Sequence, residues 1–455
     1  MIKRFISRFN IYYPQNIIYM LQASEYNIHD YFSWYFKVSD FKKVQVRKKF
    51  KKTTKGMVLL VCAWIIIVLS LVVIDNLILA LVLAPYILAY GIVIPLLVIK
   101  ILQIPVERYI LDKTKKKIKR HKGFKIAIAG SFGKTTMREI LKTVLSEGKK
   151  VASAKDSYNT PLGISKFVGG LSGDEDVLIF ELGEYYPGDI SQLCDIINPD
   201  MGIIAGINEA HLERFKTIDS TVKTIYELGE YVDSIYVNGD SKLALDSARK
   251  SDIIYCGSGI GTDLVLNTKT NLDGLSFKFK DNNFRSKLLG IHQVGPLVCA
   301  IDIAFKLGLS IEQIQKGVSK TKPFSHRLEP KESDGVVIID DSYNGNPDGA
   351  RVSIEFLKNI KARRFYITPG LVEMGSKTKE VHREIGKMLS LAGIERVVLI
   401  KNSVTGYIEE GLKENDFKGE LIWFNFAPDA YNSISSITIS GDVVLLQNDW
   451  PDQYI

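Results

Sequence analysis

The stretch FKIAIAGSFGKTTMREILKTVL, residues 124–145, joins an apolar strand-like run to a helix-like run through a glycine-containing turn. The turn GSFGKTT, residues 130–136, has the composition of a phosphate-binding loop. Its spacing departs from the usual one, because Ile128 stands where that pattern places its first glycine. Gly130 and Gly133 allow a tight turn in which backbone N–H groups point at phosphate oxygens, and the following helix adds its positive end.

The side chains after Gly133 complete this prediction. Lys134 would reach the terminal phosphates, and the Thr135 hydroxyl would take a place on a magnesium ion. A plain structural turn between strand and helix is the alternative. The predicted nucleotide-binding residues of the loop are Gly130, Ser131, Phe132, Gly133, Lys134, Thr135 and Thr136.

Length, charge and cysteine content limit the number of domains and the classes of partner that the chain can have. A chain of 455 residues, 46% hydrophobic and 24% charged, is typical of two or three folded domains. The net charge of +8 lies at the front, because residues 1–122 hold 21 Lys and Arg against 6 Asp and Glu, whereas residues 123–455 hold 38 against 45. We therefore expect no nucleic-acid partner. The four cysteines form no CxxC pair, which is typical of free thiols.

Two uncharged runs follow the basic start of the chain. Residues 57–74 and 77–99 are each about long enough to cross a hydrocarbon core of roughly 30 Å. Their flanks, residues 41–56 and 100–122, hold eight and nine Lys or Arg, which by the positive-inside rule places both flanks in the cytoplasm. The pattern predicts a multi-pass protein of the cell membrane with both termini and the catalytic domains cytoplasmic; a pair of buried core helices is the alternative.

The first 40 residues are rich in aromatic side chains scattered among polar ones. Amphipathic helices in the headgroup layer of a membrane would account for this mixture, and so would a small packed N-terminal cap.

From Phe124 onwards, short apolar runs alternate with helical segments, a pattern typical of a parallel sheet wrapped by helices. Ligands of such sheets gather beyond the carboxyl ends of the strands. Glu181 ends the run VLIFE, and Glu209 and His211 follow the run GIIAGIN. Together they could hold one or two Mg²⁺ ions, although solvated strand ends are the simpler interpretation of each residue alone.

The runs VVIIDD, RFYITPG, RVVLI, LIWFNF and DVVLLQN predict a second doubly wound sheet, and residues 262–290 predict an antiparallel extension of the first. The predicted fold class is α/β: a central phosphate-loop parallel-sheet domain and a C-terminal Rossmann-like domain, preceded by a two-helix transmembrane hairpin. The expected divisions are residues 1–56 (membrane interface), 57–99 (two transmembrane helices), 100–122 (basic linker), 123–328 (central domain) and 329–455 (C-terminal domain).

Several blocks between about residues 123 and 390 carry a family resemblance: GSFGKTT, SYNTPLGISKF, ELGEYYPGDISQL, INPDMGIIAGINEAHLERF, HRLEP, DDSYNGNPDGA and GLVEMGSKTKEVHREIG. In this order they resemble the Mur ligase family, and most closely the branch that adds D-alanyl-D-alanine to the peptidoglycan precursor. The resemblance implies a ligase that uses ATP and Mg²⁺. In this family the γ-phosphate passes to a substrate carboxylate, and an amine attacks the resulting acyl phosphate to form an amide.

The resemblance also implies roles for single residues. Lys134, Glu181 and His211 match catalytic residues, and Thr135, Glu181 and His211 match magnesium ligands. Arg327 in HRLEP matches an arginine that contacts phosphate, and Asp341 in DDSYN matches a carboxylate that holds ribose. The residues tentatively matched to the substrate side of the cleft are Asn159 and Asn344, for which hydrogen bonds that stabilise their own loops are the alternative.

The sequence differs from the family pattern at the position of the modified lysine and at the adenine pocket. Ile225 stands where the family has a carbamylated lysine, and Lys223, two positions away, would face another direction on a helix. Where the family has His-Asn-x-x-Asn at the adenine pocket, this chain has His292, Gln293 and Pro296. We expect His382 to be a helix-surface or interdomain residue.

Residues 1–122 stand in place of the family's uridine-nucleotide-binding domain. The expected function is therefore a membrane-anchored, ATP-dependent amide ligase of cell-wall or envelope polymer synthesis. It would join a small-molecule or lipid-linked carboxylate to an amino acid or peptide amine. The alternatives are a polyglutamate-like poly-amino-acid synthase and a catalytically degenerate ATP-binding scaffold.

Overall fold

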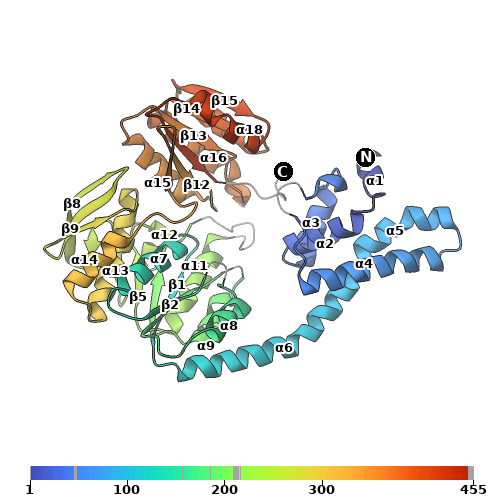
Figure 1. The fold of residues 1–455 in the computed structure, drawn as a ribbon, viewed down its shortest axis with the longest axis horizontal. Helices are drawn as coiled ribbons and strands as arrows, with labels where there is room; N and C mark the ends of the chain where they lie inside the picture. Colours follow the sequence, from blue (N-terminus) through green and yellow to red (C-terminus); the bar gives the residue numbers. More distant parts are fainter. Residues whose placement is uncertain are drawn as a thin grey trace. The chain divides into compact units, whose positions relative to one another are not determined.

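The computed structural model describes residues 2–45, 49–155, 158–184, 186–208, 215, 217–343, 345–372 and 374–448. Within these ranges the chain forms two compact units, one reaching to Tyr109 and the other beginning at Ile110 (Figure 1). The predictions on Glu209, His211 and Asn344 lie outside the described residues.

The first unit is helical, and its aromatic side chains form a packed core. Tyr13, Tyr31 and Tyr35 are buried against Leu59 of one long apolar helix and Leu88 of the next. The structure thus has the packed-cap arrangement of the aromatic segment. Its helices are α1 (Ile2–Ile6), α2 (Tyr13–Ala23), α3 (Ile28–Lys37), η1 (Phe41–Lys43), α4 (Thr54–Val73), α5 (Leu77–Gly91) and the start of α6 (Val93–Arg120).

The second predicted apolar run, 77–99, lies within a helical stretch, Leu77–Arg120, that is interrupted at one residue. It breaks at Ile92, between α5 and α6, because Pro95 has no N–H to donate to the carbonyl of Gly91. By length and composition, Thr54–Val73 and Leu77–Arg120 are long and apolar enough to cross a membrane. Many of their apolar side chains are exposed in this unit, in contrast to those of α2.

The second unit contains two sheets, and the larger one follows the predicted alternation of strands and helices. Its strand order among the described residues is β10-β9-β8-β7-β6-β5-β4-β1-β3-β2, and β1 pairs in parallel with both β3 and β4. The strands are β1 (Phe124–Ala129), β2 (Val151–Ser153), β3 (Val177–Glu181), β4 (Met201–Ile204), β5 (Ile235–Asn238), β6 (Ile253–Cys256), β7 (Gly259–Ile260), β8 (Asp263–Asn271), β9 (Gly274–Phe279) and β10 (Asn282–Ser286).

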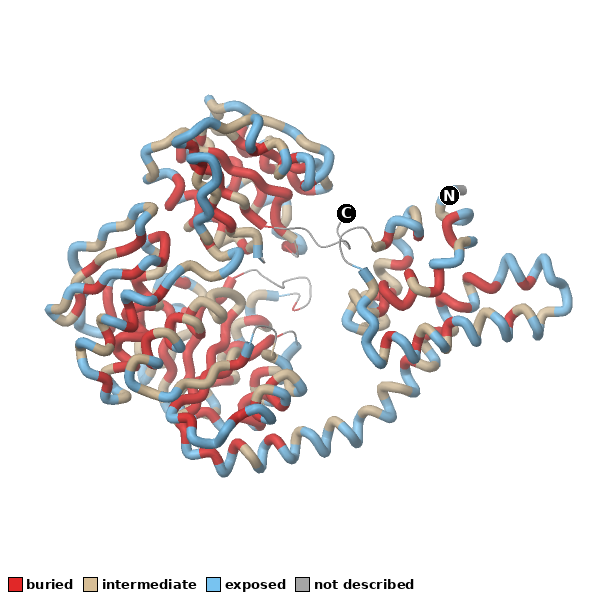
Figure 2. Tube along the Cα trace, in the orientation of Figure 1, coloured by how far each residue is buried: buried red, intermediate tan, exposed pale blue. Residues whose placement is uncertain are grey.

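Helices cover both faces of this sheet, so its parallel strands are buried (Figure 2). The helices α7, α13 and α14 pack on one face, and α8, α9, α11 and the end of α6 pack on the other. Their bounds are α7 (Lys134–Leu145), α8 (Pro161–Gly169), α9 (Asp189–Ile197), α11 (Ile218–Tyr226), η2 (Glu227–Glu230), α12 (Lys242–Asp246), η3 (Ile291–Gln293), α13 (Val294–Lys306) and α14 (Ile311–Lys320).

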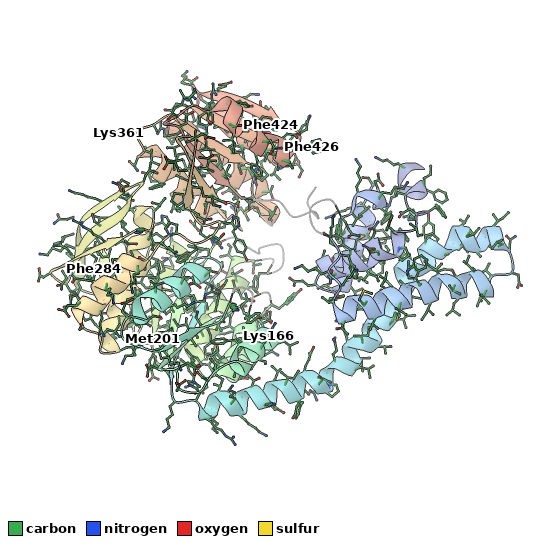
Figure 3. The ribbon with its side chains drawn as sticks, viewed as in Figure 1. Lys166, Met201, Phe284, Lys361, Phe424 and Phe426 are labelled. Atoms are coloured by element: carbon green, nitrogen blue, oxygen red, sulfur yellow. The ribbon has the colours of Figure 1, made fainter. Side chains whose placement is uncertain are left out.

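The predicted antiparallel extension over residues 262–290 is confirmed as β8, β9 and β10. Phe277 of β9 and Phe284 of β10 stack with ring centroids 5.5 Å apart on the buried face of these strands. Figure 3 labels Phe284 in this part of the sheet. The alternation of buried and exposed side chains, which is typical of a sheet with one covered face, explains why the pattern could be recognised.

The predicted second doubly wound sheet is also confirmed. Among the described residues its order is β11-β12-β16-β13-β14-β15, with all pairs parallel except the edge pair β11 and β12. Its elements are β11 (Glu329–Ser333), β12 (Val336–Asp341), α15 (Pro347–Lys358), β13 (Arg364–Thr368), η4 (Gly375–Lys377), α16 (Thr378–Leu391), β14 (Arg396–Ile400), α17 (Thr405–Glu414), β15 (Glu420–Phe424), α18 (Ala427–Asn432), α19 (Ile434–Ile437) and β16 (Val443–Gln447).

Two glycines allow α16 and α17 to pack closely in this second sheet domain. A Cβ at Gly386 would lie 2.2 Å from the carbonyl oxygen of Ile408, and a Cβ at Gly411 would lie 2.1 Å from that of Arg383. Since both obstacles are backbone atoms, a side chain at either position would force the helices apart.

We therefore expect Gly386→Ala to lower the free energy of unfolding of this domain by about 1–3 kcal/mol. Gly406→Ala, in α17 but with no atom within 4 Å of its added Cβ, should leave the stability unchanged or raise it by up to about 1 kcal/mol. Native-state hydrogen exchange of β13 and β14 measures both changes. Equal protection in the two variants would contradict close helix packing at Gly386.

Candidate active site

The phosphate loop leaves β1 in a conformation that glycine favours. Gly130 has φ +142° and Gly133, the N-cap of α7, has φ +79°. The N–H of Ser131 donates to the carbonyl oxygen of Gly206, 2.8 Å away, on the segment after β4. This bond fixes the loop beside the carboxyl end of the neighbouring strand.

Two carboxylates face the first residues of α7. Both oxygens of Glu181, at the end of β3, accept from the Thr135 hydroxyl at 3.1 Å, and one accepts from Arg138 at 3.2 Å. The Glu184 oxygens accept from Lys134 Nζ at 2.8 and 3.0 Å, and Lys134 also bonds to the carbonyl of Gly130. The structure thus brings the predicted Lys134, Thr135 and Glu181 together.

The donor set around Thr135 fits a magnesium ion. Mg²⁺ prefers hard oxygen ligands, and the Thr135 hydroxyl and the Glu181 carboxylate supply such oxygens next to the phosphate loop. These two residues would hold the ion, which when bound would offset the negative charge of the phosphates.

A cavity of about 560 Å³ adjoins the phosphate loop. Of the predicted nucleotide residues, Phe132, Gly133 and Thr136 line its near side, and Arg327 and Asp341, at the start of the second sheet domain, line it as well. Both sheet domains therefore contribute to one cavity large enough for a nucleotide.

The residues that depart from the family's adenine pattern also line this cavity. Burial lowers the pKa of His292 to about 4, so its ring is neutral at pH 7, and Gln293 Nε2 donates to its Nε2 at 2.9 Å. Asp240, which follows β5, accepts from the N–H of Gly257 at 2.8 Å, and burial raises the pKa of its carboxyl. Gln293 and Asp240 thus place polar groups in this part of the cavity, which Pro296 also lines.

Arg327 and Asp341 are held by different contacts. The Arg327 guanidinium lies 4.9 Å from the centre of the Tyr343 ring. The residues before and after Arg327 in the chain, His326 and Leu328, have φ values of +61° and +45°, which are in the left-handed region. Asp341 accepts from the Ser353 hydroxyl at 2.7 Å and from Gln447 Nε2 at 2.8 Å. Burial raises the pKa of the Asp341 carboxyl to about 6, although these bonds and the charge of Arg327 oppose the shift.

The tentative substrate residue Asn159 lies beside the end of β3. Its carbonyl accepts from the N–H of Gly183 at 2.9 Å, and a Cβ on Gly183 would meet the Asn159 backbone and side chain at about 3 Å. The Asn159 side chain is half-buried, and both the substrate role and the alternative of loop-stabilising side-chain hydrogen bonds stay predictions.

Ile225 and Lys223 of α11 and His382 of α16 lie in different environments. Ile225 is fully buried in the core beneath α11, and Lys223 is exposed, as expected of a solvated lysine. The prediction of a surface or interdomain position for His382 is wrong. Its ring is fully buried inside the second sheet domain, where Nδ1 donates to the Thr378 carbonyl and Nε2 accepts from the N–H of Leu371.

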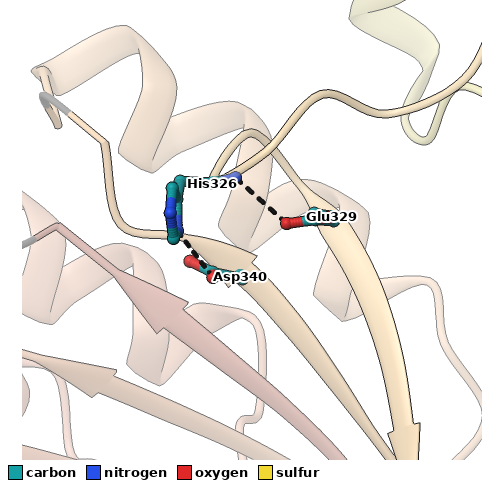
Figure 4. A group of neighbouring side chains, drawn as sticks. All are labelled: His326, Glu329 and Asp340. Carbon is teal, nitrogen blue, oxygen red and sulfur yellow. Dashed lines mark hydrogen bonds and ion pairs between the residues drawn. The ribbon is translucent and has the colours of Figure 1, made fainter.

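A separate cluster, His326, Glu329 and Asp340, has the spacing of a possible metal site (Figure 4). Glu329 accepts from the N–H of His326, and His326 Nδ1 lies 2.8 Å from Asp340. Lys331 Nζ lies 3.0 Å from carboxylate oxygens of both acids, so an ammonium already offsets part of the negative charge of this cluster. Its geometry is that of an ion-pair network supporting the turn that carries Arg327.

Comparison with known proteins gives the family. The chain matches the Mur ligase middle domain over residues 128–304 and the glutamate ligase domain of Mur ligases over residues 326–447. These are the two sheet domains whose facing edges form the cavity. The chain belongs to the Mur ligase family, whose members are ligases that use ATP and Mg²⁺.

Similar proteins include UDP-N-acetylmuramoyl-tripeptide–D-alanyl-D-alanine ligases. That of Bacillus subtilis is 26% identical over 332 residues, covering 71% of this chain and 72% of the relative, and that of Borreliella burgdorferi is 26% identical, covering 67% and 66%. MurF from Thermotoga maritima in complex with ADP shares the fold with TM-score 0.66 at 23% identity, covering 75% of this chain and 80% of its own. The chain spans 58–72% of the length of the first such relatives.

These comparisons correct the predicted localisation. The prediction of a multi-pass cell-membrane protein with cytoplasmic termini and catalytic domains is wrong, because the chain is similar to UDP-N-acetylmuramoyl-tripeptide–D-alanyl-D-alanine ligases and its two apolar helices are only weak evidence for membrane spans. Apolar length and composition cannot separate a membrane span from a core helix. In this chain α4 and α5 pack on each other and on the aromatic core of their own unit.

Sequence reasoning missed three residues near the cavity: Glu184, Asp240 and Asn208. Asn208 Nδ2 donates to Asn346 at 2.9 Å and to Asp348 at 3.0 Å, and so links the two sheet domains. Asp240 follows a strand end, the signal that identified Glu181, and could have been found in the same way. Asn208 ends the run GIIAGIN and carried the same signal, whereas the pairing of Glu184 could not be found in this way, because its partner Lys134 is 50 residues away.

The raised pKa of Asp341 predicts a pH dependence of stability. Between about pH 4 and pH 6 the carboxyl is protonated in the folded chain but ionised in the unfolded one, so this group stabilises the fold at low pH. That contribution is lost as pH rises through about 6. We expect wild-type protein to lose stability relative to Asp341→Asn between pH 4.5 and 7.5, as measured by urea unfolding of the second sheet domain. Parallel pH profiles of the two proteins would contradict a protonated Asp341.

Proposed function

We propose that this chain is a MurF-type amide ligase that transfers the γ-phosphate of ATP to a peptide carboxylate and joins the activated carbonyl to a dipeptide amine. The substrates we propose are those in the name of its relatives, a UDP-linked muramoyl tripeptide and D-alanyl-D-alanine. The observation that carries the proposal is the convergence of Lys134, Thr135 and Glu181 on one phosphate loop beside a cavity that reaches Arg327 and Asp341.

The contacts around the loop support distinct roles. Lys134 and the amino end of α7 would hold the terminal phosphates, and positive charge there offsets the charge that develops during phosphoryl transfer. Arg327, stacked on Tyr343, would contact phosphate from the other side of the cavity, and Asp341 would accept from ribose hydroxyls. His211, Asn159 and Asn344 stay proposals drawn from their matching blocks.

We further propose the domain division 123–328 and 329–455 for the catalytic part, which the matched ranges 128–304 and 326–447 support. The unit before Ile110 lies ahead of both ranges. A lipid-linked tripeptide is an alternative to the UDP-linked substrate, and the exposed apolar side chains of α4 and α5 are the observation that motivates it.

Lys134→Ala provides the test. The full-length protein is assayed with ATP, Mg²⁺, UDP-linked muramoyl tripeptide and D-alanyl-D-alanine, and both ADP release and the amide product are followed. We expect wild-type protein to form both in equal amounts. Lys134→Ala should lower kcat by at least about 100-fold, because it removes a preorganised cation from the phosphate site.

Different outcomes separate the candidate functions. Product formation only with a lipid-linked tripeptide would replace the UDP-linked substrate in the proposal. ADP formation driven by glutamate alone would favour a poly-amino-acid synthase. Nucleotide binding without ADP release under any of these conditions would exclude a ligase and favour an ATP-binding scaffold.

A further inference from the structure

Glu184 is a buried carboxylate at the phosphate loop with no role in the function proposed above. Its side chain is 1% exposed, and both of its oxygens accept from Lys134 Nζ, at 2.8 and 3.0 Å. The lysine side chain is itself only 12% exposed. The pair therefore lies largely out of water, where the interaction between charges is stronger than at the surface.

A buried carboxylate is costly once its cation is withdrawn, since removal of one partner leaves an uncompensated charge. If Lys134 left Glu184 entirely for an incoming triphosphate, this buried carboxylate would lose an ammonium that lies 2.8 Å away just as negative phosphates arrive. An ammonium has three N–H donors. Lys134 can therefore keep one bond to Glu184 and still offer a donor to a phosphate oxygen, in place of its bond to the Gly130 carbonyl.

We propose that Glu184 is a positioning residue that stays bonded to Lys134 when nucleotide binds, and that it limits the net positive charge of the phosphate site. This inference rests on the proposed ligase function. It gives Glu184 two effects: it fixes the direction in which Lys134 presents its remaining donors, and it weakens the hold of the site on bound nucleotide.

Among the described contacts, the two carboxylates of the site bond to different side chains of α7. Glu181 accepts from Thr135 and Arg138, whereas Glu184 accepts from Lys134. The contacts thus assign Glu181 to the proposed magnesium position and Glu184 to the lysine. Magnesium dependence can therefore distinguish a positioning role from direct metal ligation.

Glu184→Gln, which keeps the size of the side chain but removes its charge, gives the sharpest test. Because the site gains one unit of positive charge, the Kd of the full-length protein for ATP and ADP should fall by about 3–10-fold. The kcat should fall by about 10–100-fold, because Lys134 is no longer fixed in direction and ADP leaves more slowly. Isothermal titration gives the two Kd values, and steady-state ligation gives kcat.

Tighter nucleotide binding together with slower turnover is a combination that mere loss of structure would not produce. Unchanged or weaker binding of ATP to Glu184→Gln would overturn the proposal. So would a marked rise in the Mg²⁺ concentration needed for half-maximal activity, which would make Glu184 a metal ligand instead.

Two further variants make the result decisive. Glu184→Asp keeps the buried charge but shortens its reach, so ATP affinity should stay within about twofold of wild type while kcat falls; equal kcat would contradict a positioning role. Glu147→Gln removes the same charge just beyond the other end of α7, where Glu147 pairs with Lys316 and Lys320, and should change neither Kd nor kcat. Failure of the proposed function itself is distinguishable, since wild-type protein would then form no amide product.

Discussion

The close approach of two backbone segments at Gly130 and Gly206 is the constraint on which the site depends. A Cβ at Gly130 would lie 2.7 Å from the Gly206 carbonyl oxygen, the atom that accepts from the N–H of Ser131. A Cβ at Gly206 would in turn lie 2.3 Å from the Phe132 ring. Neither position can take a side chain without displacing the other segment. The phosphate loop therefore packs directly against the segment that follows β4. This contact holds the start of α7 close to the carboxyl end of β1.

From this contact the remaining geometry follows through the order of the strands. Because β1 lies between β3 and β4 and all three run in parallel, their carboxyl ends share one edge of the sheet. That edge receives Glu181 from β3 and, three strands along, Asp240 from the end of β5. The second sheet contributes Asp341 from the carboxyl end of β12. Two sheets with separate cores thus turn the same kind of edge toward one cavity.

Features set by local sequence could be predicted, and features set by distant contacts could not. The apolar runs of β1, β3 and β12 and the glycines of the phosphate loop lie close together in the chain, and their patterns identified the fold and the loop. The buried ring of His382 accepts a hydrogen bond from the N–H of Leu371. This contact comes from a loop outside the helix, so the periodicity of the helix does not predict it. Likewise, the break at Ile92 lies within an apolar run that reads as continuous, and of its two prolines only Pro95 is next to a break, whereas Pro85 lies inside α5.

The electrostatics of the site favour entry of the nucleotide together with its magnesium ion. Lys134 pairs with Glu184, and Arg138 pairs with both Glu181 and Glu139, so these described groups hold two cations against three carboxylates before a ligand arrives. A free triphosphate would add more negative charge than Lys134 and the amino end of α7 could offset while Lys134 stays paired with Glu184. A divalent cation at the oxygens of Thr135 and Glu181 would remove much of that excess, so the pairing that keeps these side chains in place also makes metal-free ATP a poor ligand.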